Sequence, residues 1–134
     1  MQTRDQKYGA AIFKQVSNLK KEADTKGKEG KAYTDSYGSM AHKLPVLIRS
    51  AGLAQALAFV EARGKDEHKD LLDHLARVVF SDESSNRSAL SQQSRTTTQL
   101  SEYMRLTHEV MAALVWYKRF AQSVLDVDAS AAST

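Results

Sequence analysis

The spacing of the apolar residues is the feature of this sequence that most restricts its fold. Between Tyr8 and Val124, apolar residues recur every three or four positions over most of the chain, which is the period of one face of an α-helix. No stretch alternates apolar and polar residues as a half-buried β-strand does, and no segment is repeated. The pattern predicts an all-α fold, a compact single-domain bundle of five to six helices with a long C-terminal helix.

The helical pattern also gives approximate boundaries. Thr3 and Gln6 have the spacing of a capping box and are expected to start the first helix. The region from residue 81 to residue 97 is polar, serine-rich and only weakly periodic, so it is expected to be a loop with one short helix near Ala89. The first helix is expected to cover about residues 3–24. Further helices are expected over residues 33–43, 66–80 and 98–126, the last being the longest, and a pair of helices is expected around Gly52.

Glycine and proline mark the expected breaks between helices. Two glycines among charged residues predict an exposed loop from residue 25 to residue 31. Pro45 disfavours helical geometry at the residue before it, so a kink or a restart is expected near Leu44. Gly52 can let two helices approach closely, and Gly64 is expected to stop a helix at its C-terminus.

The length and composition favour one domain. A chain of 134 residues predicts a single helical domain over residues 1–126 and a disordered C-terminal tail over residues 127–134. The absence of cysteine excludes disulfides and cysteine catalysis. The polar N-terminus has no signal-peptide core, and no window has the roughly 18 apolar residues of a membrane span, so a cytoplasmic protein without membrane contact is expected.

The charges are distributed unevenly along the chain. Lys and Arg exceed Asp and Glu by ten to five in residues 1–49, giving +5. Residues 50–83 carry four against seven, giving −3, and residues 84–134 carry five against four, giving +1, for the total of +3. A basic side and an acidic side are therefore expected, which suits a nucleic acid on one flank and head-to-tail protein contacts elsewhere. Ordinary variation in surface charge can produce the same distribution.

Several cations are candidates for contacting phosphates. On the first helix, residues 4, 7, 11, 14, 18 and 21 share one face, which contains no acid and extends about 25 Å. A solvated helix face explains this row equally well. His42 and Arg49, seven residues apart, would share one side if the helix continues through Pro45. The predicted RNA-binding residues are Arg4, Lys7, Lys14, Lys43, Arg49, Arg105 and Arg119.

The sequence contains no motif typical of an enzyme. No phosphate-binding glycine loop, nucleophile elbow or HExxH motif occurs, so no catalytic activity, cofactor or small-molecule substrate is expected. Asp70 and His74 are one helical turn apart and could bind a metal together, although two ligands do not complete a site. A metal-dependent nuclease that uses Asp70, Asp73 and His74 is therefore kept as a minor alternative, and no metal site is expected.

The segment from residue 110 to residue 117 is apolar around the whole circumference of the predicted last helix. One side must face the core, so the other side must face a partner or another part of the same chain. Met111 and Trp116 are residue types that suit a protein interface. A fully surrounded central helix is an equally simple explanation.

Three segments carry a resemblance to a known family. MQTRDQKYGAAIF opens the chain, YGSMAHKLPVLIRSAGLAQALAFVEARG covers residues 37–64, and EYMRLTHEVMAALVWYKRFAQSVL covers residues 102–125. Together they resemble the small helical subunit of the type III-B CRISPR effector, the Cmr complex. The most specific part is KLPVLIRSAGLAQALAF, residues 43–59, followed in the right order by WYKRFAQ, residues 116–122.

The resemblance implies a structural role. Several identical copies of such a subunit would stack inside an RNA-guided ribonucleoprotein, beside the backbone subunits that hold the guide RNA, and would line the channel where guide and target RNA pair. The family supplies no nuclease residues, because the backbone subunits cut the target. The implied partners are other Cmr subunits, copies of the chain itself, guide RNA and target RNA. A generic helical adaptor that binds only protein remains the alternative.

Overall fold

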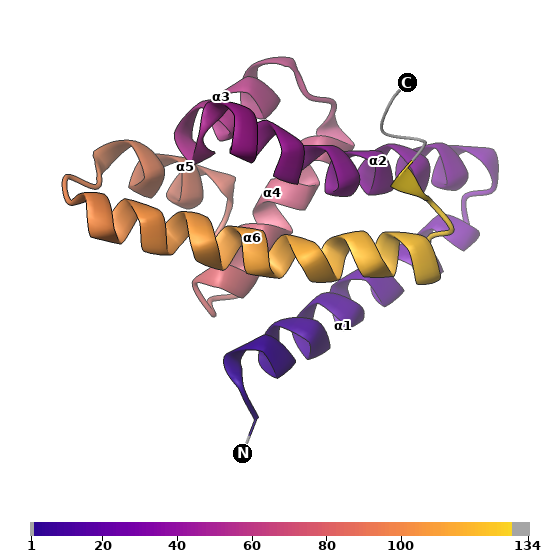
Figure 1. Ribbon diagram of the computed structural model, residues 1–134. Helices are drawn as coiled ribbons and strands as arrows, with labels where there is room; N and C mark the ends of the chain where they lie inside the picture. Colours follow the sequence, from indigo (N-terminus) through magenta and orange to yellow (C-terminus); the bar gives the residue numbers. More distant parts are fainter. Residues whose placement is uncertain (1, 130–134) are drawn as a thin grey trace.

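The computed structural model describes residues 2–129, and this part of the chain folds into six α-helices without any β-strand (Figure 1). The predicted all-α class is therefore confirmed. None of the described helices is long and apolar enough to span a membrane. The helices are α1 (Arg4–Asp24), α2 (Lys28–Ala51), α3 (Leu53–Arg63), α4 (Asp66–Val79), α5 (Arg87–Thr96) and α6 (Leu100–Ser123).

The two longest helices form the centre of the bundle. Figure 1 shows α6 lying along α2 and running in the opposite direction, with α1 crossing beneath α6. Helix α4 lies behind and packs against α1, α2, α5 and α6. The α3 and α5 helices pack against each other at the end of the bundle where α2 finishes and α6 starts. The basic α1 therefore lies at one side of the molecule, held mainly by α6 and α2.

The residues that gave the helical period form the core. Ile12 on α1, Leu44 on α2, Leu72 on α4 and Leu114 on α6 are each completely buried. Burying one such side chain stabilises a fold by about 1.5–3 kcal/mol, so these positions fix which face of each helix turns inward. The faces left outward carry most of the charged residues, including those of the predicted RNA-binding set.

The predicted capping box is present at the start of α1. The Thr3 hydroxyl accepts a hydrogen bond from the Gln6 backbone N–H at 3.0 Å, and the Gln6 side-chain oxygen accepts one from the Thr3 N–H at 2.8 Å. Gly64 ends α3, as predicted. Both signals involve residues close together in the sequence, which explains why sequence analysis found them.

The helix restart predicted near Leu44 does not occur. Helix α2 continues through Pro45, and the chain instead turns at Gly52, whose φ of 88° favours glycine. Proline removes one helical hydrogen bond, but Leu44, Pro45 and Ile48 are all buried against neighbouring helices. Burial of this face outweighs the local preference of proline.

The loop predicted from residue 25 to residue 31 is shorter than expected. Only residues 25–27 connect α1 to α2, and Gly27 has a φ of 59° at this turn. Gly30 lies within α2 and is buried, because the two helices meet there: a Cβ atom on Gly30 would collide with the backbone of Ala23. Gly30 is therefore a packing residue and not a loop residue.

The end of the last helix also differs from the prediction. Helix α6 ends at Ser123 and is as long as α2, at 24 residues each. Val127 was expected to begin a disordered tail, but it is buried, and its N–H donates to the Ala121 carbonyl at 2.8 Å. Its carbonyl accepts from Nε2 of His42 at 2.9 Å. The remaining part of the predicted tail, residues 130–134, lies outside the described residues.

Candidate nucleic-acid interface

All seven cations predicted to contact RNA have exposed side chains, distributed over three helices. Helix α1 carries three of them, and α2 and α6 carry two each. The exposure of every one is compatible with binding a large anion, because none is needed inside the core. The residues are Arg4, Lys7 and Lys14 on α1, Lys43 and Arg49 on α2, and Arg105 and Arg119 on α6.

The structure brings Arg4 and Arg105 together around one acid. The Glu109 carboxylate accepts from the Arg4 guanidinium at 3.3 Å and from the Arg105 guanidinium at 3.1 Å. The two arginines are 101 positions apart in the sequence, and the start of α1 meets α6 at this point. Because both guanidinium groups are mostly exposed, these ion pairs contribute little stability. They do orient two cations at the same edge of the molecule.

The basic row on α1 faces away from the core, as its period predicts. Ile12 and Val16 are buried on the opposite side of the helix, whereas Lys7, Lys14 and Lys21 are exposed. None of these three lysines forms an ion pair within residues 2–129. They remain available to an anionic partner.

The cations of α2 do not share their surface with His42. Lys43 and Arg49 are exposed, but His42 is 5% exposed and donates to the Val127 carbonyl. Helix α2 continues through Pro45, so His42 and Arg49 share one side of it as predicted, but only Arg49 is exposed there. The cause is the segment after α6, which folds over His42.

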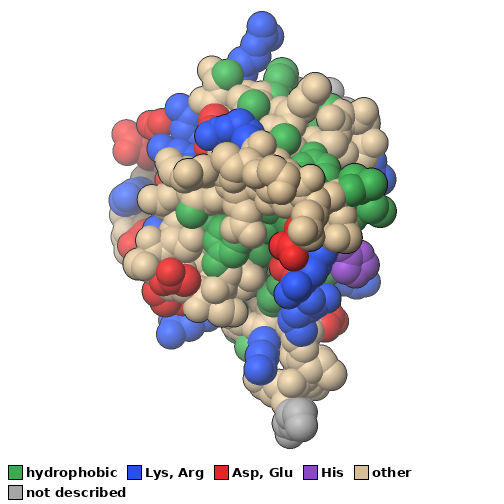
Figure 2. Space-filling model, turned by 90° about the vertical axis from the view of Figure 1, so that its left-hand side faces the viewer, with side chains coloured by type: hydrophobic (Ala, Val, Ile, Leu, Met, Phe, Trp, Pro, Cys, Tyr) green, Lys and Arg blue, Asp and Glu red, His purple; other side chains and the backbone are tan. Residues whose placement is uncertain are grey.

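Figure 2 shows how the charges lie on the end of the molecule that the left-hand side of Figure 1 presents. Lys and Arg side chains are spread around the rim of this face, with acids beside several of them. Uncharged polar and apolar groups occupy the centre. On this face, the positive side chains do not form one continuous patch.

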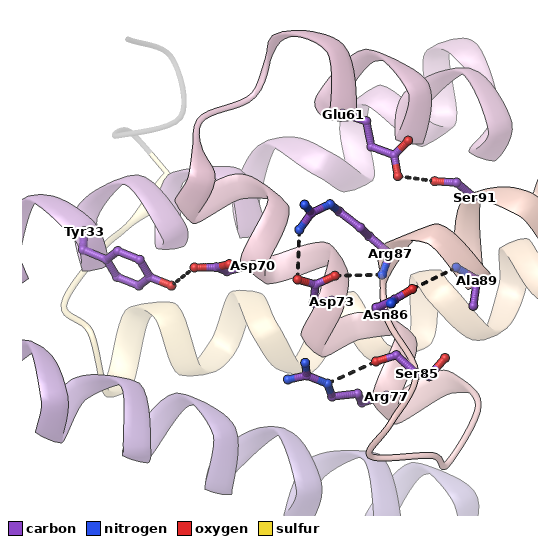
Figure 3. Close-up of polar contacts among 10 residues, drawn as sticks. All are labelled: Tyr33, Glu61, Asp70, Asp73, Arg77, Ser85, Asn86, Arg87, Ala89 and Ser91. Carbon is purple, nitrogen blue, oxygen red and sulfur yellow. Dashed lines mark hydrogen bonds and ion pairs between the residues drawn. The ribbon is translucent and has the colours of Figure 1, made fainter.

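The acidic segment that begins α4 has structural partners (Figure 3). The Tyr33 hydroxyl donates to Asp70 at 2.6 Å. Asp73 accepts from the Arg87 backbone N–H at 2.8 Å and from its guanidinium at 3.0 Å, which joins α4 to the start of α5. Among the described residues, no three His, Asp or Glu side chains are grouped so that they could hold a metal ion.

The histidines of α4 are held by α2. The Tyr37 hydroxyl lies 2.7 Å from Nδ1 of His74, and the Ser36 hydroxyl lies 3.0 Å from Nε2 of His68. Burial lowers the pKa of both histidines below the ordinary value of 6.5. Burial, followed by the hydrogen bond and charge of Asp70, raises the pKa of Tyr33 well above its ordinary range. These groups form a polar layer between α2 and α4.

Sequence analysis missed an aromatic cluster of Phe13, Trp116 and Phe120 between α1 and α6. The ring centroids of Phe13 and Phe120 are 5.3 Å apart, and those of Trp116 and Phe120 are 5.6 Å apart. Phe13 is nevertheless 50% exposed. Phe13 lies next to the core position Ile12 and outside the basic row, so its spacing gave no indication of a surface role.

The family is decided by a match over almost the whole chain. Residues 4–124 match the family model described as CRISPR-associated protein (Cas_Cmr5). The chain belongs to the Cmr5 family. A curated relative, the "CRISPR system Cmr subunit Cmr5" of Thermus thermophilus, is 42% identical over 126 residues, which cover 94% of this chain and 99% of the relative. The predicted resemblance is confirmed.

A solved structure of the Cmr5 family has the same fold. The crystal structure of a CRISPR-associated Cmr5 family protein, also from Thermus thermophilus, superposes with a TM-score of 0.74 at 42% sequence identity. The match covers 92% of this chain and 98% of that chain. The described helical bundle is therefore the fold of a Cmr5 family protein.

Proposed function

We propose that the chain is a non-catalytic structural subunit of an RNA-guided CRISPR type III-B (Cmr) ribonucleoprotein in the cytoplasm. Several copies would stack along the channel where guide and target RNA pair, and would support target RNA binding for antiviral defence. Membership of the Cmr5 family and the 42% identical Cmr subunit support the assignment to this kind of complex.

The observation that carries the RNA contact is a set of exposed, unpaired cations. Lys7, Lys14, Lys43, Arg49 and Arg119 are exposed and form no ion pair within the part of the chain that the structure describes. Such side chains bind the phosphates of RNA without reading its bases. Pairing with the guide would supply the sequence specificity, as in other RNA-guided effectors.

The surface also suits contacts with other copies and with other Cmr subunits. Head-to-tail stacking of identical copies needs two unlike, complementary faces. The +5 charge of residues 1–49 and the −3 charge of residues 50–83 provide opposite signs. Large apolar side chains that suit an interface are exposed on α2 and α6, namely Val46, Leu100, Met104 and Val115.

Co-purification tests the structural role. The chain, produced with its native partner proteins, is expected to elute with them, and mass measurement of the intact complex should give more than one copy per complex. RNA extracted from the complex should contain the guide. The proposal would be contradicted if the chain eluted alone and the partner proteins contained the same RNA with and without it.

Charge reversal tests the RNA contact. Assembled complexes that contain the triple variant Lys14→Glu, Lys43→Glu and Arg49→Glu should bind target RNA more weakly than wild type, because three phosphate contacts become repulsive. Reversal of Lys20 and Lys31, which pair with Asp24 and Asp35 on the surface, provides the control. The isolated chain is expected to bind RNA weakly or not at all.

The second candidate function is a helical adaptor that binds only protein, and the exposed apolar residues of α6 favour it. Under this reading, the basic residues serve only solubility, and the triple reversal leaves target affinity unchanged in an intact complex. The metal-dependent nuclease alternative makes a separate prediction. It requires that the purified chain cleaves RNA when a divalent metal is added. It also requires that the variants Asp70→Asn and Asp73→Asn lose this cleavage.

A further inference from the structure

We propose that the aromatic cluster between α1 and α6 is a stacking site for an unpaired base of single-stranded RNA. This inference rests on the proposed function, because it assumes that RNA reaches this surface. It goes beyond phosphate contact, since it adds Phe13, Trp116 and Phe120 as residues that would touch a base.

The cluster is open at one end. Trp116 and Phe120 are partly buried and stack with an interplanar angle of 26°, whereas the Phe13 ring meets Phe120 edge-on at 69°. Phe13 is half exposed although it is in contact with another ring. An aromatic ring that is fixed on one side and open on the other can accept a flat apolar group, and every nucleobase has such a face.

The open ring rests on a rigid support. Trp116 lies against α1 at Gly9, where a Cβ atom would be 3.0 Å from the indole ring. The indole N–H donates to the Asp5 carboxylate at 3.0 Å. Because glycine allows this close approach and the hydrogen bond fixes the indole, the cluster is held in place before any ligand arrives. A preorganised surface loses little conformational entropy on binding.

Exposed cations are the sequence neighbours of cluster residues on both helices. Lys14 follows Phe13 directly on α1, and Arg119 precedes Phe120 directly on α6. Both side chains are exposed, and neither forms an ion pair with any described residue. A strand whose base stacks on Phe13 would therefore have exposed, unpaired cations of α1 and α6 available for its phosphates.

Two acids where α1 meets α6 have partners within the chain. Asp5 accepts the Trp116 indole N–H, and Glu109 pairs with both Arg4 and Arg105. The indole N–H is neutral, so Asp5 keeps its negative charge, and the cations free to bind phosphate are those without an ion pair among the described residues, Lys14 and Arg119. RNA offers flat apolar base faces connected by negative phosphates, and therefore fits an aromatic ring with nearby cations. A typical protein surface, in which acidic and basic side chains are mixed, fits it less well.

Photocrosslinking in the assembled complex tests the proposal directly. Phe13 is replaced by the photoreactive analogue p-benzoyl-phenylalanine, which keeps an aromatic ring, and the complex is irradiated with labelled target RNA. The matched control carries the same analogue at Phe59, which is 45% exposed on α3. We expect an RNA adduct from position 13 at an unpaired nucleotide, and none from position 59.

The alternatives give different results. Adducts only to a protein subunit would show that the cluster is a protein interface, and equal RNA adducts from positions 13 and 59 would show contact without a specific site. Either result overturns the proposal.

Affinity measurements separate this inference from the proposed function. Phe13→Leu, which keeps an apolar side chain but removes the ring, should weaken target binding about five-fold or more, the effect of losing one stacked base. Phe59→Leu should have no effect. If the triple charge reversal weakens binding but Phe13→Leu does not, RNA contact stands and the stacking site is rejected. If neither variant weakens binding, both proposals fail.

Discussion

At the scale of single residues, two glycines show how closely the helices are packed. Gly30 faces the backbone of Ala23 where α1 meets α2, and a Cβ on Gly38 would lie 2.8 Å from Cβ of Val127. Neither position needs a left-handed backbone, so glycine is required there for space. The sequence placed Gly30 in a loop and Gly38 in a helix. It could not show that Gly30 contacts a residue seven positions away, or that Gly38 contacts a residue 89 positions away.

Gly30→Ala should destabilise the fold by about 2 kcal/mol or more, because added atoms force the backbones of α1 and α2 apart. Alanine also favours the helix by about 0.5–1 kcal/mol, and this gain is smaller than the loss. The free energy of unfolding in urea measures the difference. Lys28→Ala is the control, because it introduces the same helix-forming residue at an exposed position near the same end of α2. Equal stability of Gly30→Ala and wild type would contradict the described packing.

His74 predicts a pH dependence of stability. Burial lowers its pKa in the folded protein, and the charge of Arg77 acts in the same direction, against Asp70, Asp73 and Glu83. The unfolded chain therefore binds a proton near pH 6.5 that the folded chain does not bind. The contribution of His74 to stability is present above this pH and is lost as the pH falls below it.

His74→Gln should reduce the loss of stability between neutral and mildly acidic pH. Part of the change of unfolding free energy with pH should remain, because burial also lowers the pKa of His68. His108→Gln serves as the control, because His108 is exposed on α6. Unfolding free energies at a series of pH values give the slope, and an unchanged slope in His74→Gln would show that this histidine is not the cause.

At the scale of helices, the joint between α2 and α3 depends on α6. The chain turns at Gly52, and the first N–H groups of α3 have no partner within that helix. The Tyr103 hydroxyl accepts from the Ala54 N–H at 3.0 Å and so caps α3 from a distant helix. Sequence analysis placed a helix pair around Gly52 but could not find this cap, because the two residues are 49 positions apart.

Tyr103→Phe should cost about 1–2 kcal/mol, because the Ala54 N–H loses its partner in a partly buried place. Amide exchange of the first residues of α3 should also become faster than in wild type. Tyr8→Phe offers a matched control, since the Tyr8 hydroxyl has no hydrogen-bond partner among the described residues. Similar exchange and stability in the two variants would argue against the cap.

Helix positions were predictable where the controlling contacts are local. Thr3 and Gln6 cap α1 as predicted, and the periodic apolar residues are the buried ones. The prediction of a helix restart failed at Pro45 because the local preference of proline is weaker than the burial of the α2 face around it. The tail prediction failed at Val127 because the residues that contact it, Gly38 and His42, lie on α2, far away in the sequence.

At the scale of the whole molecule, sequence reasoning identified exposed cations but not their arrangement. Period and charge correctly predicted that Lys14, Lys43, Arg49 and Arg119 face solvent. They could not show that Arg4 and Arg105 share Glu109, or that Phe13 remains open beside Lys14, because both depend on how α1 crosses α6. A surface is a property of the packed helices.

The central claim is that cations on several helices of this chain contact target RNA through its phosphates. The salt dependence of target affinity in the assembled complex tests it most directly, because each phosphate contact to a single strand contributes about 0.7 to the log–log slope. Lys14→Gln, Lys43→Gln and Arg49→Gln together should reduce the slope by up to about 2, whereas Lys20→Gln and Lys31→Gln, which change lysines that already form ion pairs, should leave it unchanged. Identical slopes for wild type and the triple variant would contradict the account.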